Sequence, residues 1–180
     1  GKDYFICTTN VDSQINKAGF SEERIFAMQG NYCYFQCIRP CTDQVYYNQE
    51  MIERMVGHMP NPFEIRKEDV PKCPRCGKPL VPNLRCDDSF VETPHLKNRS
   101  VYEQFIRDCA DKNTVLLELG VGYNTPVLIR YPFERITAGY PKSQLIRINN
   151  TCAGVPGEIR GRSLSICRDL QEALVQLNNF

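Results

Sequence analysis

Two pairs of cysteines constrain this chain more than any other feature of its sequence. Cys37-x3-Cys41 is followed, after 31 intervening residues, by Cys73-Pro-Arg-Cys76-Gly-Lys. In such knuckles the backbone curls so that both sulfurs face one point, and Gly77 permits the tight turn that the second pair needs. Four thiolates complete a tetrahedral site without an open position. We therefore expect one structural zinc ion per chain, with no metal chemistry.

The other six cysteines are scattered through apolar segments and lack the spacing of a disulfide scaffold: Cys7, Cys33, Cys86, Cys109, Cys152 and Cys167. This usage favours a reducing compartment, in which each is a small buried hydrophobic residue. Two of the six leave an alternative open. Cys33 precedes the first knuckle and Cys86 follows the second, so either is a candidate replacement for one of the four zinc ligands.

The composition indicates a soluble chain with one core. Of its 180 residues 42% are apolar, and 22 basic against 21 acidic side chains leave a net charge of +1. That balance provides no general attraction to nucleic acid or to anionic membranes. No apolar run reaches the ~20 residues that a membrane-spanning helix requires. We expect a cytoplasmic protein that binds neither nucleic acid nor membrane.

The expected helices and strands alternate at both ends of the chain, and the middle interrupts them. Strands are predicted at 4–8, 24–28, 115–119, 145–148 and 164–167, and helices at 13–18, 49–56, 101–110, from Pro126, and at 169–177. Periodicity fades between Gln29 and Cys86, apart from the helix at 49–56. This order predicts an α/β fold.

In this fold a parallel sheet has helices on both faces and carries an inserted small zinc-binding module. The expected division is 1–28 for the start of the Rossmann-like domain, 29–86 for the zinc-binding module and 87–180 for the remainder of the Rossmann-like domain. Gly120-Val121-Gly122 follows the strand at 115–119, at the sheet edge where α/β folds bind nucleotides. Such a turn also serves simply to connect a strand to a helix, so it needs support from other residues.

That support comes from the segment Thr8-Thr9-Asn10-Val11-Asp12 and from the pair Gln29-Gly30 just ahead of the cysteines. Here the chain resembles the sirtuin family. In sirtuins a strand ends in Thr-Gln-Asn-Ile-Asp, a later His-Gly pair carries the catalytic histidine, and a four-cysteine zinc module follows. Further matches are Pro82-Asn83, the turn Gly120-Val121-Gly122, and Asn149-Asn150 after the next strand.

The resemblance implies NAD as substrate. It places Thr9, Asn10, Asp12, Gly120, Val121, Gly122, Asn149 and Asn150 at the NAD site, with Asp12 holding the nicotinamide carboxamide and Thr9 replacing the usual glutamine. A structural alternative is that Asn10 or Asp12 caps the helix near Ser13.

Two departures from the sirtuin pattern bear on the chemistry. Gln29 occupies the position of the catalytic histidine, while the two histidines of the chain, His58 and His95, lie elsewhere. A carboxamide orients a hydroxyl but does not take its proton, as sirtuin deacylation requires.

The second departure follows Pro82-Asn83, where most sirtuins have an apolar run that lines the acyl-lysine tunnel. This chain has Leu84-Arg85-Cys86-Asp87-Asp88 instead. Arg85, Asp87 and Asp88 are therefore expected to face a polar acceptor, or to pair internally as Arg85 with Asp87 or Asp88, because unpaired buried charge is costly. A solvated loop is the remaining alternative.

Together these features resemble the class M, macrodomain-linked sirtuins, which are protein ADP-ribosyltransferases. That resemblance implies transfer of ADP-ribose from NAD to a lipoyl-carrier protein related to the glycine cleavage H protein, with a macrodomain protein as a functional partner. Asn10 and Gln29 align with the residues implicated in that branch. The alternatives are an NAD-dependent protein deacylase and a non-catalytic, zinc-stabilised binding module.

The resemblance also implies a longer parent protein. Sirtuins open with a strand and a Gly-rich loop that holds the pyrophosphate, and Gly1 matches a position beyond both. We therefore expect this chain to be the carboxyl-terminal part of a sirtuin. Its Rossmann-like parallel sheet and its NAD site would then be incomplete, and the chain would have no activity of its own.

Overall fold

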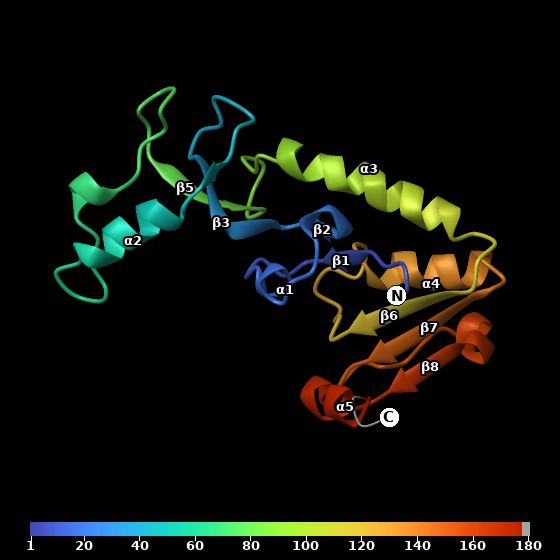
Figure 1. Cartoon of the computed structure of the whole chain (residues 1–180). Helices are drawn as coiled ribbons and strands as arrows, with labels where there is room; N and C mark the ends of the chain where they lie inside the picture. The colour runs from blue at the N-terminus through green and yellow to red at the C-terminus, as the bar shows by residue number, and fades with distance from the viewer. Residues whose placement is uncertain (178–180) are drawn as a thin grey trace. The chain divides into compact units, whose positions relative to one another are not determined.

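The structure, a computed structural model, describes residues 1–177 (Figure 1). Contacts divide the chain into two compact units, Gly1–Tyr102 (unit 1) and Glu103–Phe180 (unit 2). Within residues 1–177, no helix combines the length and the apolar character needed to cross a membrane.

Unit 1 begins with two parallel strands, β1 (Ile6–Thr8) and β2 (Ile25–Ala27). The connection holds a short helix, α1 (Gln14–Lys17), and a 3₁₀ turn, η1 (Glu22–Arg24). The first part of α3 (Thr93–Asp108) packs here, because the Tyr102 ring lies 5.5 Å from the ring of Phe5 and 5.9 Å from that of Phe26.

An antiparallel sheet follows in unit 1, in the order β4-β3-β5. Its strands are β3 (Gly30–Cys37), β4 (Tyr46–Tyr47) and β5 (Leu80–Leu84), and the helix α2 (Gln49–Gly57) and the 3₁₀ turn η2 (Lys67–Asp69) lie between β4 and β5 in the sequence. The core of this part consists of Phe35, Met55 and Leu80 together with the buried Cys37 and Cys73. Two of the cysteines predicted to bind zinc are thus core residues.

Unit 2 holds a parallel sheet in the order β6-β7-β8, visible side by side in Figure 1. The elements are β6 (Thr114–Leu119), α4 (Arg130–Gly139), β7 (Ser143–Ile148), η3 (Gly157–Arg162), β8 (Ser163–Ile166) and α5 (Leu170–Leu177). Both α4 and η3 contact β7, and the buried core of Leu116, Leu145 and Ile159 includes residues of β6, β7 and η3.

The α/β class, the parallel sheet and the cysteine-bearing module are confirmed, whereas several elements differ from expectation. The region expected to lack periodicity contains the strands β3 and β5. Helix α3 begins at Thr93 rather than at Val101. Helix α4 begins at Arg130 rather than at Pro126, because residues 126–129 form a turn in which the Pro126 carbonyl accepts the Tyr131 N–H at 2.9 Å. The three domain boundaries stay predictions.

Candidate functional site

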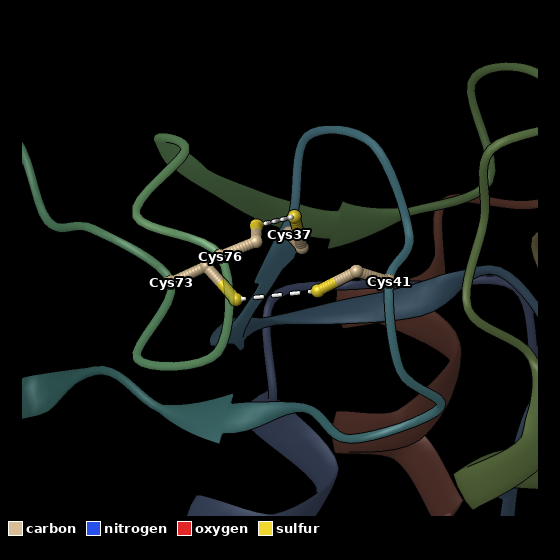
Figure 2. A group of neighbouring side chains, drawn as sticks. All are labelled: Cys37, Cys41, Cys73 and Cys76. Carbon is tan, nitrogen blue, oxygen red and sulfur yellow. Dashed lines mark hydrogen bonds between the residues drawn. The ribbon is translucent and has the colours of Figure 1, made fainter.

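The four predicted zinc ligands converge in unit 1 from the end of β3, which carries Cys37, and from the loops that carry the other three cysteines (Figure 2). All four sulfurs lie within 4.8 Å of one another, with 3.5 Å between those of Cys37 and Cys76 and 3.6 Å between those of Cys41 and Cys73. A tetrahedral zinc ion with Zn–S bonds of ~2.3 Å separates its sulfurs by about 3.8 Å. The donor set and its spacing therefore fit a tetrahedral zinc ion.

The second knuckle has the local geometry that the sequence predicted. Gly77 adopts a φ of 70°, and its N–H donates to the Cys73 carbonyl at 2.8 Å, which closes the tight turn. Burial raises the pKa of the Cys73 thiol, but N–H donors from Cys76 and Arg75 and bonds from neighbouring thiols outweigh it and lower this pKa to about 6. The lowered pKa favours the thiolate of Cys73, which is the form that binds zinc.

Neither of the two alternative ligands belongs to the four-cysteine cluster. The Cys33 sulfur lies 3.2 Å from the Ser13 hydroxyl, which donates to Asn31 Oδ1 at 2.6 Å. Cys86 is an exposed residue whose N–H donates to the Leu84 carbonyl.

The two carboxamides singled out by the sequence lie at equivalent places on neighbouring strands. Thr8 pairs with Ala27 at the end of the parallel β1–β2 pair, and the Met28 N–H continues the ladder to the Thr8 carbonyl at 3.0 Å. Asn10 lies two residues after Thr8, and Gln29 lies two residues after Ala27. The carboxyl ends of both strands therefore carry an amide side chain, Asn10 exposed and Gln29 half-buried.

Local hydrogen bonds shape the turn after β1. The Asn10 N–H donates to the Thr8 hydroxyl at 3.0 Å, and Asp12 Oδ1 accepts the Gln14 N–H at 3.1 Å. Asp12 thus satisfies an amide at the start of α1, as in the capping alternative. Its second carboxylate oxygen accepts no hydrogen bond among those found in residues 1–177, so capping still leaves one oxygen for a ligand.

Gln29 is held through its backbone by a close approach between strands β3 and β5. Its carbonyl accepts the Arg85 N–H at 3.0 Å. The next residue, Gly30, has a φ of 89°, and a Cβ atom there would lie 2.1 Å from the Asn83 carbonyl oxygen and 3.0 Å from the Phe90 ring. Only glycine fits this position, so the place of Gln29 is set by the neighbouring strand.

The loop after β5 does not pair its charges as expected. Arg85 forms an ion pair with Glu92, and its guanidinium lies 4.5 Å from the centre of the Phe90 ring. The predicted pairing of Arg85 with Asp87 or Asp88 is wrong for this structure. Bonds from the Ser89 side chain and backbone lower the pKa of Asp87, while Asp88 is exposed.

Unit 2 contains a cluster of four charges that the sequence analysis missed. Glu118 and Arg147 pair directly across β6 and β7, and Arg147 Nε lies 2.7 Å from Glu118 Oε1. Arg130 Nη1 lies 3.4 Å from the same Glu118 oxygen, and Arg147 Nη2 lies 2.9 Å from Glu134 Oε1. Glu118, Arg130 and Arg147 are each no more than 1% exposed. With two charges of each sign, this charge quartet is neutral as a whole.

The charge quartet fixes the two loops that carry the remaining predicted residues. Arg130 donates to the carbonyls of Val121, Cys152 and Gly154 at 3.2, 2.9 and 3.0 Å. Asn149 is buried and donates to the Val121 carbonyl at 3.1 Å. The turn Gly120-Val121-Gly122 and the strand end at Asn149 are therefore joined, whereas Asn150 is exposed.

Comparisons with known proteins agree with this architecture. No family model matches the chain. It is 30% identical over 172 residues to a protein named "Protein ADP-ribosyltransferase" from Staphylococcus aureus, covering 94% of this chain and 54% of that protein. It is 29% identical over 176 residues to a Fusarium oxysporum protein named "Probable bifunctional ADP-ribose hydrolase/ADP-ribosyltransferase", covering 93% of this chain and 29% of the relative.

Solved structures decide the fold. The structure of Sir2Tm bound to a propionylated peptide is similar with a TM-score of 0.60 at 18% identity, over 97% of this chain and 62% of that one. A Sir2 structure with a p53 peptide and NAD+ is similar with a TM-score of 0.58, also at 18% identity, over the same shares. The chain has the sirtuin fold.

The sirtuin resemblance of the sequence is thus confirmed at the level of the fold. The chain spans about half the length of the staphylococcal relative and less than two thirds of the sirtuin chains. Within this sirtuin fold, unit 1 brings together the cysteines and places Asn10 and Gln29 on paired strands. Unit 2 joins the Gly-rich turn to Asn149. The role of each of these residues stays a prediction.

Proposed function

We propose that the longer protein containing this chain is a sirtuin-type protein ADP-ribosyltransferase that uses NAD. The observation that carries the proposal is the pair of carboxamides, Asn10 and Gln29, at matching positions beyond β1 and β2. The names of the two relatives support it, as does the NAD+ named with one of the structural neighbours. The four cysteines would hold a structural zinc ion and take no part in the reaction.

The chemistry suits two neutral amides. As the bond between nicotinamide and the ribose C1′ breaks, its electron pair goes to the pyridinium nitrogen, and positive charge grows on the ribose. The acceptor nucleophile supplies the new pair to C1′ and loses its proton to solvent. Asn10 and Gln29 orient the ribose hydroxyls while that charge develops, which lowers the barrier through positioning and requires no strong base.

A protein deacylase is the second candidate, and Gln29 opposes it. Deacylation in sirtuins needs a base at this position, and a carboxamide has no basic site near neutral pH. We therefore expect the parent protein to leave acetyl-lysine peptides unchanged in the presence of NAD. Robust deacylation by the unmodified parent would overturn the transferase proposal.

The acceptor that we propose is a lipoylated carrier protein of the glycine cleavage H type, with a macrodomain protein as functional partner, in the cytoplasm. The exposed carboxylates of Asp87 and Asp88 favour a polar acceptor over an acyl chain, since burying them against an apolar group would be costly.

The test is transfer of labelled ADP-ribose to the lipoylated carrier by the parent protein. Asn10→Ala and Gln29→Ala should each abolish labelling while zinc content stays unchanged, and the double variant should lose little more, because groups that act as a unit are not additive. Asn113→Ala, which removes an exposed carboxamide in the turn before β6, is the matched control. Labelling at the parent's rate by both single variants would show that these residues are structural.

A further inference from the structure

A buried polar network lies beneath the loop at 85–92 in unit 1. Asn83 is fully buried, and its Nδ2 donates to Gln36 Oε1 at 2.7 Å and to the Val91 carbonyl at 3.0 Å. Gln36 in turn donates from Nε2 to the Ser89 carbonyl at 2.7 Å and accepts the Val91 N–H at 2.9 Å. The loop is thereby tied to strands β3 and β5 through two buried carboxamides.

This network fixes the tautomer of His95. Because Asn83 Nδ2 uses both of its protons on carbonyl oxygens, Asn83 Oδ1 faces His95 Nε2, at 2.8 Å. An amide oxygen only accepts hydrogen bonds, so His95 must donate, and its proton lies on Nε2. Burial lowers the pKa of His95, the nearby Arg85 lowers it further, and Glu92 opposes the shift. The imidazole is therefore neutral near pH 7.

The same imidazole contacts the ring that borders Gln29. His95 stacks on Phe90 with 5.4 Å between ring centres and 20° between planes. The Arg85 guanidinium lies 4.5 Å from the centre of the Phe90 ring, and an atom of this ring would lie 3.0 Å from a Cβ atom at Gly30. Arg85 donates its backbone N–H to the Gln29 carbonyl at 3.0 Å. His95 thus contacts Phe90, and Phe90 contacts both Gly30, the residue that follows Gln29, and Arg85, which binds the Gln29 carbonyl.

We propose that His95 is a positioning residue, which sets the backbone at Gln29 and the loop at 85–92 through Asn83 and Phe90. The proposal rests on the proposed function, in which Gln29 orients the ribose and this loop meets the acceptor. A second proton on His95 places a positive charge beside Arg85, and Glu92 is the acidic group that faces both. Protonation therefore strains the stack, and the loop loses its fixed place below the pKa of His95.

The positioning is tested without catalysis by NMR of the zinc-loaded chain. The chain has two histidines, so each imidazole is assigned by comparison with His58→Gln. We expect the Nε2–H tautomer at His95, and backbone amide shifts of Gly30 and Arg85 that titrate with the midpoint of His95. In His95→Gln those amide shifts should no longer titrate. An Nδ1–H tautomer, or Gly30 and Arg85 amides that do not follow the titration, would overturn the proposal.

Transfer by the parent protein gives the second measurement. His95→Phe keeps a ring on Phe90 but removes the donor to Asn83, and should raise KM for the carrier about tenfold, the effect of one lost hydrogen bond. His95→Gln keeps a donor, should recover most of that loss, and should lack the parent's fall in rate on the acid side. His58→Gln should behave as the parent. Equal KM values in all variants would refute a role in transfer.

The two failures are distinguishable. If the parent transfers no ADP-ribose to any carrier while Gly30 and Arg85 follow His95, the proposed function is wrong and the positioning is right. If the parent transfers ADP-ribose and those amides ignore His95, the reverse holds.

Discussion

Replacing Gly30 by alanine tests the close approach that places Gln29. The backbone at Gly30 has a φ of 89°, where an L-residue costs roughly 1–2 kcal/mol. The added Cβ would also lie 2.1 Å from the Asn83 carbonyl oxygen, so β3 and β5 must separate. Overpacking of this kind costs about 1–3 kcal/mol. We expect Gly30→Ala to lower the free energy of unfolding by roughly 2–5 kcal/mol.

Gly19 provides a matched control for the conformational part of this cost. Its φ is 88°, and no atom lies within 4 Å of a Cβ built there. Gly19→Ala therefore carries the strain without the clash, and the difference between the two variants isolates the contact with Asn83.

The assay is urea unfolding of the zinc-loaded chain followed by circular dichroism, with equal slopes required before midpoints are compared. A Gly30→Ala variant that loses no more stability than Gly19→Ala would show that the strands have room for a Cβ. Strand β5 would then not set the place of Gln29.

Two further predictions concern zinc and pH. About one zinc ion should copurify per chain. Cys73→Ser should lose both the metal and the ordered module, because metal binding and folding are linked there. Metal analysis that finds less than about half an equivalent of zinc in freshly prepared, folded chain would contradict this. The lowered pKa of His95 means that the unfolded state binds its proton first as the pH falls. Stability should therefore be complete above the unfolded pKa of ~6.5 and decline below it, and His95→Gln should flatten this part of the profile.

The sequence was most informative where short-range spacing determines geometry. The Cys-x2-Cys knuckle with Gly77 and the apolar strands of unit 2 follow from local pattern, and the structure shows both. Strands β3 and β5 were missed because Gln36 and Asn83 are polar residues buried in strands. Their burial depends on partners far away in sequence, which no periodicity reveals.

The charge quartet was missed for a related reason, although a signal for it exists. A glutamate within the apolar strand 114–119 and an arginine within the apolar strand 143–148 are unusual unless they meet, and parallel pairing puts Glu118 opposite Arg147. The part played by His95 had no such signal, since its partners Asn83 and Phe90 are brought to it by the fold.

The charge quartet also limits how this sequence can change over generations. Removing one partner of a buried ion pair costs about 3–5 kcal/mol, whereas exchanging the whole group for apolar residues is often neutral. A lineage that replaces Arg147 or Glu118 singly therefore passes through a poorly folded intermediate. The loss is a large fraction of the free energy of unfolding of an ordinary protein. The four charged positions should therefore vary together or stay fixed. Because Arg130 binds the carbonyls of Val121 and Gly154, the conformation of these two loops should also stay constant, even without selection for ligand binding.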